Sequence, residues 1–194
     1  MSKYFAVRTW KRSASVTVGG GLPNGAMGAT RHAIEDLALM RALPGMMAVV
    51  PGDPIEAPTA TRAVAEDTGP CYLRLGEAGE SIMHQTEIPF ELGITIHTRE
   101  DRDTTLICSR GILQTAVRTA QRPAGGNQTR WLSMHTLKPF DTEAVLAAAR
   151  ETRAIPTLGE QRILGGLRSA VAEVPAEADI PRLPFRKIGV PAAF

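Results

Sequence analysis

The stretch MMAVVPGDPIEAPTATRAVAEDTGPCYLRL, residues 46–75, decides the fold class of this chain. Its first part, residues 46–50, is uniformly apolar, which is typical of a strand buried on both faces of a sheet. A Pro-Gly-Asp-Pro turn follows, and Pro54 can occupy the first turn of a helix that continues to about Asp67. Gly-Pro then ends the helix and residues 71–75 form a second strand, so the stretch predicts a parallel α/β layer.

Upstream of this stretch the sequence adds one more strand and one more helix. Ser15–Val18 is a short β-branched run that predicts a strand, and a glycine-rich loop over residues 19–28 follows it. Apolar residues recur at helical spacing over 31–43, with Thr30 in position to cap that helix and Pro44-Gly45 to end it. Three strands make only a small sheet, which indicates that the first domain is incomplete.

A connector over residues 76–92 separates this layer from a second α/β unit. The predicted domains are therefore a partial first domain over 1–80, a linker over 81–92 and a second domain over 93–194. In the second unit the patterns predict strands at 93–97, 104–109, 130–134, 153–158 and 184–188, and helices at 111–122, 142–152 and 166–174.

The overall composition is that of an ordinary soluble globular protein. Hydrophobic residues make up 43% of the 194 residues and charged residues 22%. The formal net charge of +2 and the scattered Arg and Lys residues argue against nucleic-acid binding. The first residues lack the apolar core of a signal peptide, and no apolar run approaches the roughly 20 residues that span a bilayer. We therefore expect a cytoplasmic protein without membrane contact, in which Cys71 and Cys108 are buried, reduced thiols.

The glycine-rich loop over 19–28 lies between a strand and a helix, where a phosphate can bind free N–H groups. It is not a P-loop, because no Lys follows the glycines. Its spacing also differs from the dinucleotide-binding fingerprint Gly-x-Gly-x-x-Gly. Taken alone, the loop fits tight-turn packing better than phosphate binding.

Two further positions carry possible chemistry, and each has a simpler structural explanation. His32 and Asp36 are four apart on one face of the predicted helix, so His32 could act as a general acid or base; ordinary surface ion pairing is the simpler interpretation. Arg74 ends a predicted strand, where a guanidinium suits a phosphate or carboxylate ligand; a structural ion pair explains it equally well. The 4 histidines are far apart in sequence and none has a cysteine at ligand spacing, so no metal site is predicted.

Residues 28–44 carry a resemblance to the transketolase family. Their sequence GATRHAIEDLALMRALP resembles the family signature Gly-(Ala/Pro)-Thr-His-His-x-Ile-Glu-Asp followed by Leu-Met-Arg. Further segments match the family in the same order, at residues 49–57, 69–76, 132–141 and 165–173. The resemblance covers about residues 14–194, and the type that it resembles most is the C-terminal subunit of split bacterial transketolases.

The resemblance implies an α/β fold in two parts. A truncated parallel-sheet portion of the pyrimidine-binding domain comes first, and a three-layer α/β transketolase C-terminal domain follows. In the family, a Glu of the pyrimidine-binding domain hydrogen-bonds the aminopyrimidine of thiamine diphosphate, and its motif lies upstream of the matched part. The diphosphate and its Mg ion belong to a further, N-terminal domain. The resemblance therefore assigns no cofactor ligand, no metal ligand and no confident catalytic residue to this chain.

The resemblance does assign substrate binding, at Arg31, His32 and Arg74. Arg31 stands where the family has the first His of Thr-His-His, which contacts the sugar, and His32 matches the second His. Arg74 matches the Arg that holds the sugar phosphate. In the second domain Gln161 replaces the His of the family's Glu-His, and Arg168 replaces the last Gly of its Gly-Gly-Leu-Gly-Ser segment.

Three prolines also depart from the family pattern. Pro123, Pro156 and Pro175 fall where the family has helix or strand residues. A proline inside a helix costs about 3 kcal/mol, so Pro123 and Pro175 are expected to end their helices early. Together with Arg31, these positions indicate relaxed constraint on the chain.

The sequence thus predicts the C-terminal portion of a thiamine-diphosphate transketolase, which transfers a two-carbon ketol unit between sugar phosphates, as in the pentose phosphate pathway. Such a chain is expected to be inactive alone. It would need an N-terminal transketolase subunit, or would self-associate through apolar faces that the missing part leaves open. The alternative is a non-catalytic truncated homologue that acts at most as an interaction domain. A third possibility, deoxyxylulose-phosphate synthase or a 2-oxoacid dehydrogenase component, fits the Ile34-Glu-Asp36 and Ser133-Met-His-Thr136 segments less well.

Overall fold

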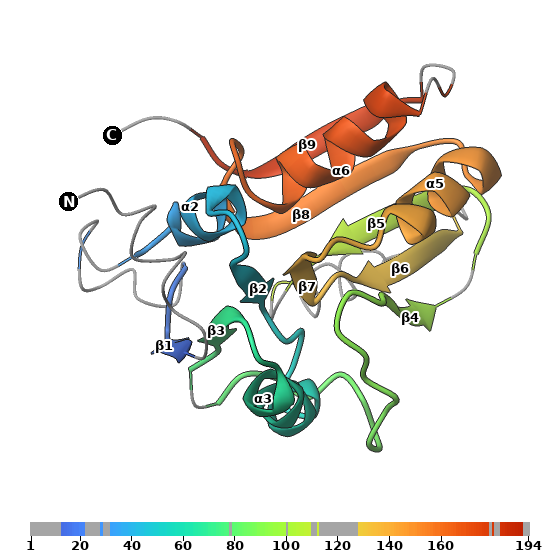
Figure 1. Ribbon diagram of the computed structural model, residues 1–194. Helices are drawn as coiled ribbons and strands as arrows, with labels where there is room; N and C mark the ends of the chain where they lie inside the picture. Colours follow the sequence, from blue (N-terminus) through green and yellow to red (C-terminus); the bar gives the residue numbers. More distant parts are fainter. Residues whose placement is uncertain are drawn as a thin grey trace.

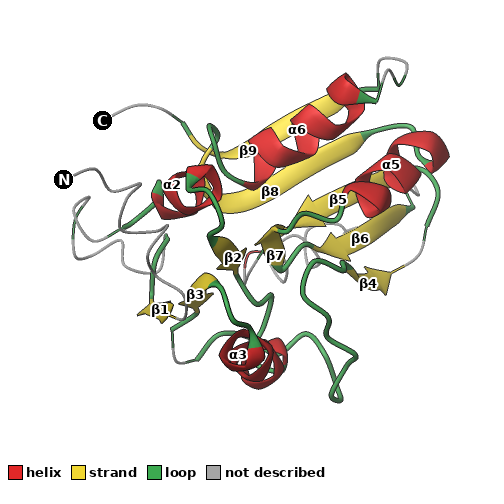
Figure 2. Ribbon diagram, viewed as in Figure 1, coloured by secondary structure: helices red, strands yellow, loops and turns green. Residues whose placement is uncertain are grey.

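Two β-sheets and the helices packed against them make up the described part of the chain (Figure 1, Figure 2). The structure is a computed structural model, and it describes residues 13–21, 28, 32–77, 79–99, 101–109, 112, 128–178, 180 and 183–191. In chain order the elements are β1 (Ser13–Val18), α2 (Asp36–Ala42), β2 (Met47–Val49), α3 (Glu56–Glu66), β3 (Pro70–Leu75), β4 (Ile96–Arg99), β5 (Thr104–Cys108), β6 (Thr129–Ser133), β7 (Thr136–Lys138), α5 (Thr142–Glu151), β8 (Ile155–Arg162), α6 (Leu167–Glu177) and β9 (Phe185–Val190).

The first sheet has the strand order β1-β3-β2-β7. Its first three strands are parallel, with Ser13 opposite Pro70 and Met47 opposite Cys71. This arrangement confirms the α/β layer that residues 46–75 predict. The last strand, β7, comes from the second half of the chain and runs antiparallel to β2, where Ala48 pairs with Lys138. The sequence patterns did not predict this strand.

The second sheet has the strand order β4-β6-β5-β8-β9 and is parallel except for its edge strand β4. The five predicted strands all appear, with bounds that shift by a few residues. Helices α5 and α6 lie side by side over one face of this sheet (Figure 1). The predicted helix over 111–122 lies outside the described residues, apart from Ile112. No described helix has both the length and the apolar character to cross a membrane.

One hydrophobic core connects the two halves of the chain. Its buried side chains include Leu37 and Tyr72 from the first half and Ile107, Leu132 and Leu167 from the second. Each of these side chains is at most 4% exposed. Burial of this kind contributes about 25 cal/mol per Å² of apolar area, so the shared core ties the two halves together energetically. The two cysteines are buried and unpaired, as predicted.

The helix expected over residues 31–43 is shorter than its apolar spacing indicates. Helix α2 begins at Asp36, because Ala33 adopts a left-handed conformation with φ of 44° that a continuous helix cannot contain. The cap predicted at Thr30 lies outside the described residues. His32 and Asp36 therefore do not share a helix face, and that expectation was wrong.

Of the three prolines that depart from the family pattern, the structure describes Pro156 and Pro175, and both lie within elements. Helix α6 continues through Pro175 to Glu177, so the prediction that Pro175 ends the helix was wrong. Pro175 lies in the last turn, where Ala178 N–H donates to Val174 C=O at 3.1 Å and keeps the turn closed. Pro156 lies in β8 opposite Arg186 of β9, and the pairing of β8 with β5 starts one residue later, at Thr157. Pro123 lies outside the described residues.

Candidate functional site

Arg74 lies near the carboxyl end of β3, and its side chain is completely buried. Its Nη1 donates to the Asp36 carboxylate at 2.5 Å and to the Ala33 carbonyl at 3.4 Å. Asp36 is the first residue of α2, so the start of this helix supplies the negative charge that the buried guanidinium requires. Of the two interpretations of Arg74, the structural ion pair is therefore present in this conformation.

A chain of hydrogen bonds extends the pair across the sheet. The Tyr72 hydroxyl donates to the second Asp36 oxygen at 2.6 Å, and Thr17 of β1 donates to the Tyr72 hydroxyl at 3.0 Å. Burial, together with the bond to Asp36, raises the pKa of Tyr72 to about 12, so the phenol stays protonated at physiological pH. This network fixes the position of Asp36 and with it the direction of Arg74.

The described start of the glycine-rich loop, at Gly20 and Gly21, packs against the Arg74 guanidinium. A Cβ atom at Gly20 would lie 2.8 Å from Arg74 Nε, which is closer than real contacts allow. Gly21 has a φ of 105°, which only glycine adopts readily, and its N–H donates to the His32 carbonyl at 2.6 Å. Gly20 and Gly21 thus serve close packing here, as the loop pattern alone favoured. Arg74 has no exposed surface, so an anion does not reach its guanidinium in this conformation.

The second half of the chain contributes the remaining wall of the site. A Cβ at Gly21 would collide with the carboxylate of Glu160 from β8, and Glu160 is 9% exposed. Arg162, at the end of the same strand, makes the next contact: its Nε lies 2.5 Å from the Glu35 carboxylate and its backbone N–H donates to Ile34 C=O at 3.1 Å. The sequence placed Glu160 in a family motif but gave no sign that it meets the glycine loop.

The structure describes two of the three residues to which the resemblance assigns substrate binding. His32 is half-buried beside the loop, and its Nε2 is buried with no hydrogen-bond partner among the described residues. Arg74 is buried and pairs with Asp36 beside the same loop. Arg31 lies outside the described residues. Substrate binding by these three residues therefore stays a prediction.

The two positions that depart from the family in the second half are fully buried. Arg168 is 0% exposed and donates to four backbone carbonyls: Ile188 at 2.7 Å, Gln161 and Arg162 at 2.9 Å each, and Gly159. Burial lowers the pKa of Arg168 to about 10, which leaves the side chain charged at neutral pH. Arg168 therefore holds the ends of β8 and β9 together, a structural role that its position in a motif did not indicate.

A cluster of Asp53, Glu56 and His84 is the one group among the described residues whose geometry could hold a metal ion. The Asp53 carboxylate, however, already accepts four backbone N–H groups, two from its own turn and two from Met83 and His84 of the linker. Glu56 accepts from Gly52 N–H at 2.5 Å and from the His84 ring and Ser133 hydroxyl at 3.1 Å each. These donors satisfy the carboxylates, so we interpret the cluster as a structural clamp on the linker.

The described residues do not fit a thiamine diphosphate site. The buried carboxylates of the first half are already used, Asp36 by Tyr72 and Arg74, and Asp53 and Glu56 by the linker clamp. No carboxylate among these is left to bind an aminopyrimidine ring or a diphosphate-bound metal ion. We therefore assign no cofactor ligand to the described part of this chain.

Family comparisons cover both halves of the chain. The model of the transketolase pyrimidine-binding domain matches residues 3–78, and the model of the transketolase C-terminal domain matches residues 93–193. The predicted division into 1–80, 81–92 and 93–194 stays a prediction. Strand β7 and the hydrophobic core both cross the predicted linker.

Two of the curated relatives are named as transketolase subunits. The chain is 33% identical over 176 residues to an apulose-4-phosphate transketolase subunit of Phocaeicola vulgatus, covering 90% of this chain and 55% of that protein. It is 34% identical over 168 residues to a 6-deoxy-6-sulfo-D-fructose transketolase subunit of Clostridium sp., covering 86% of this chain and 52% of that protein. The chain thus spans about half the length of these relatives.

Solved structures give the same result. A split-gene transketolase described as an inactive beta4 tetramer matches with a TM-score of 0.83 and 36% identity, over 93% of this chain and 58% of that chain. A transketolase from Campylobacter jejuni shares the fold, with a TM-score of 0.60 at 16% identity, over 76% of this chain and 24% of that chain. Because two family models together span most of the chain, it belongs to the transketolase family, as a counterpart of the C-terminal part.

Proposed function

We propose that this chain is the C-terminal portion, or subunit, of a thiamine-diphosphate-dependent transketolase and that it is inactive alone. The observation that carries the proposal is the Arg74 cluster, in which a phosphate-binding side chain of the family lies where the two halves of the chain meet. The relatives named as transketolase subunits support it. Family membership implies dependence on thiamine diphosphate, and a partner chain would supply the ligands for the cofactor and its Mg ion.

In the assembled enzyme this chain would bind the sugar phosphate substrate. Arg74 would hold the phosphate, since a guanidinium forms charge-assisted bonds to phosphate oxygens. His32 and Arg31 would face the sugar, and the buried, unbonded Nε2 of His32 is free to take a hydroxyl partner. For Arg74 to bind phosphate, Asp36 or the loop at Gly20 and Gly21 has to move, so partner binding would have to open the cluster.

The partner would be an N-terminal transketolase subunit, with self-association as the second arrangement. The structural relative described as an inactive tetramer of β chains supports the view that such chains assemble without their partner and without activity. The proposal includes a cytoplasmic location, which the two reduced, buried thiols Cys71 and Cys108 support.

The activity of the isolated chain is the first property to test. We expect the purified chain alone to show no ketol transfer from xylulose 5-phosphate to ribose 5-phosphate, because no described residue binds the cofactor. The measurement is a coupled assay with added thiamine diphosphate and Mg ion, beside a tag-only control. Transfer above that control contradicts the proposal that the chain is inactive alone.

A capture experiment tests the partner. The tagged chain is recovered from its native lysate, and thiamine diphosphate is quantified in the eluate. Stoichiometric cofactor together with a second chain that carries the transketolase N-terminal domain supports the subunit function. A single band without cofactor favours the alternative, a non-catalytic homologue, which the replacements Arg31, Gln161 and Arg168 also favour.

A further inference from the structure

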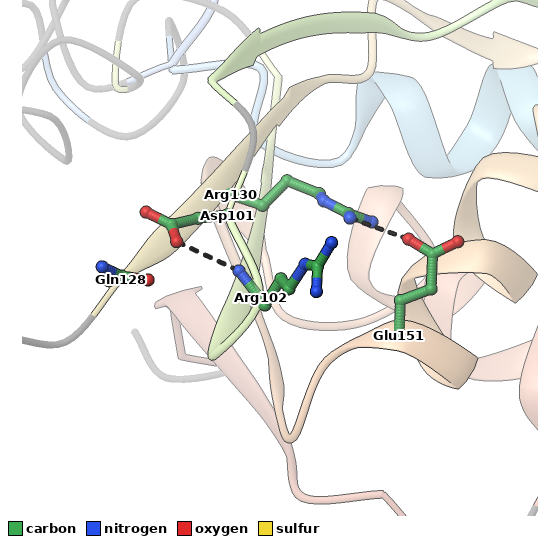
Figure 3. Close-up of a pocket in the computed structure, with 5 residues that line it drawn as sticks. All are labelled: Asp101, Arg102, Gln128, Arg130 and Glu151. Atoms are coloured by element: carbon green, nitrogen blue, oxygen red, sulfur yellow. Dashed lines mark hydrogen bonds and ion pairs between the residues drawn. The ribbon is translucent and has the colours of Figure 1, made fainter.

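A polar cavity of about 630 Å³ opens at the amino ends of β5 and β6, away from the Arg74 cluster. Figure 3 shows its lining: Asp101, Arg102, Gln128, Arg130 and Glu151. The turn before β5, the start of β6 and the last residue of α5 supply these side chains. A volume of this size is within the range of small-molecule sites, roughly 300–1,000 Å³.

The cavity is lined by two guanidinium groups and two carboxylates, and the carboxylates are paired with Arg130 and with Arg99 rather than with Arg102. Arg130 pairs with Glu151 at 2.7 Å, and Arg99 just outside pairs with Asp101 at 3.4 Å. Arg102 forms no ion pair within the described part of the chain, although its backbone N–H donates to Asp101. In Figure 3 the Arg102 guanidinium extends into the space beside the Arg130 guanidinium and the Glu151 carboxylate. Arg102 is therefore a guanidinium that faces the cavity without a carboxylate partner among the described residues.

Arg130 and its partner are unequally exposed. The Arg130 side chain is 9% exposed, whereas that of Glu151 is 54% exposed. A buried guanidinium keeps its charge and needs an anionic partner, but an exposed carboxylate contributes little to an ion pair and rotates into water easily. An incoming oxyanion can therefore replace Glu151 at Arg130 without leaving a buried charge unpaired.

We propose that this cavity binds a phosphate group, either free or carried by a small molecule, between Arg102 and Arg130. Two guanidinium groups present planar sets of N–H donors that match phosphate oxygens, and the Gln128 carboxamide adds a neutral donor at the rim. The site is independent of the proposed substrate site, because the cavity is at the end of the second sheet that points away from the first sheet (Figure 1).

The test is a titration of the ¹⁵N-labelled chain with inorganic phosphate at constant ionic strength, observed through the Nε–Hε resonances of the arginines. We expect saturable shifts of the Arg102 and Arg130 resonances, which the variants below assign. A second titration uses ribose 5-phosphate in place of phosphate. Tighter binding of the ester identifies a phosphorylated small molecule as the ligand, and equal binding identifies the phosphate group alone.

Removal of a guanidinium and removal of the Glu151 carboxylate should change the phosphate affinity in opposite directions. Arg102→Gln and Arg130→Gln should weaken phosphate binding about tenfold or more, since each removes charge-assisted hydrogen bonds. Glu151→Gln should tighten it by roughly two- to fivefold, because it removes a competing carboxylate. Arg150→Gln, the neighbouring exposed residue of α5, is the charge-matched control and should change the affinity by less than about twofold.

The Arg102→Gln variant tests the proposal even if replacement of the buried Arg130 unfolds the chain. Its side chain is exposed and forms no ion pair with a described residue, so Arg102→Gln should fold normally, which the melting temperature checks. The proposal is overturned if phosphate produces no saturable shift, or if binding is the same in Arg102→Gln and Arg150→Gln.

Discussion

At the scale of single residues, Asp36 is the centre of the candidate site. It accepts hydrogen bonds from both Arg74 and Tyr72, and it neutralises a guanidinium with no exposed surface. Removing one member of a buried pair leaves the other charge uncompensated, which costs more than the pair itself contributes.

We therefore predict that Asp36→Asn lowers the free energy of unfolding by about 3 kcal/mol. Denaturant unfolding followed by circular dichroism measures the change. Glu35→Gln is the matched control, because Glu35 is 48% exposed in its pair with Arg162. An exposed pair contributes about 1 kcal/mol or less, so equal effects of the two variants would argue against a buried, charge-compensating role for Asp36.

His84 gives a second prediction, on pH dependence. Its hydrogen bond to Glu56 raises the pKa of the His84 imidazole above 6.5, although burial acts in the opposite direction. A raised pKa in the folded state means that the stabilisation is fully present below the unfolded pKa and is lost as the pH rises through the folded value.

The free energy of unfolding of the wild type should therefore exceed that of His84→Gln most at pH 5.5, and the difference should shrink as the pH rises above 6.5. Using the difference between the two proteins cancels the acid sensitivity that His135 adds, since burial lowers the pKa of that histidine. A difference that stays constant between pH 5.5 and 8.5 contradicts a charged His84–Glu56 pair.

At the scale of elements, the strands with long apolar runs were predictable and the short or tertiary-controlled elements were not. The runs at Met46–Val50 and Thr104–Cys108 need burial on both faces, which fixes them as sheet strands. Strand β7 has three residues, too few for a period to show. Helix α2 loses its first turn because contacts of residues 32–36 with the loop and with β8 override the local spacing.

The candidate site was predictable to a similar extent. Position at a strand end singled out Arg74, and the family pattern singled out His32. The partner of Arg74 could not be read from the sequence, because Asp36 fitted a surface ion pair with His32 equally well. Glu160 and Arg162 join the site through packing between segments more than 120 residues apart, as in the contact of Arg162 with Glu35. Local patterns do not carry such contacts.

Helix α6 provides the prediction at this scale. Pro175 lacks the N–H that would donate to the Val171 carbonyl, so that carbonyl has no donor at the i+4 position of the helix. We predict that Pro175→Ala raises the melting temperature, with a gain of about 1 kcal/mol in the free energy of unfolding, smaller than for a mid-helix proline because the turn is terminal. Ala176→Gly in the same turn is the control in the destabilising direction. A lower melting temperature for Pro175→Ala would show that proline rigidity outweighs the missing bond.

At the scale of the whole molecule, β1 forms the edge of the described first sheet and exposes apolar side chains. Val16 is 53% exposed and Val18 is 66% exposed. An apolar edge strand is a surface on which another chain can pair, and the proposed partner or a second copy would cover it.

We predict that Val16→Lys combined with Val18→Lys lowers self-association of the purified chain, because lysines on an edge strand oppose pairing. Light scattering coupled to size-exclusion chromatography, over a tenfold range of concentration, measures the mass. Leu39→Lys is the control, since Leu39 is 63% exposed on α2 rather than on the sheet edge. The same decrease in mass for the control would place the contact away from β1.

The contribution of β7 to the first sheet has a further consequence for how the gene can be divided. A protein cut between residues 80 and 93 would lose the antiparallel neighbour of β2, and would leave the side chains of Leu37 and Tyr72 facing water instead of Ile107 and Leu132. Expression of either half alone therefore has two effects. The first half loses strand β7 from its sheet, and each half loses the core side chains that the other supplies. The two halves of this chain therefore depend on each other for a complete first sheet and a closed core.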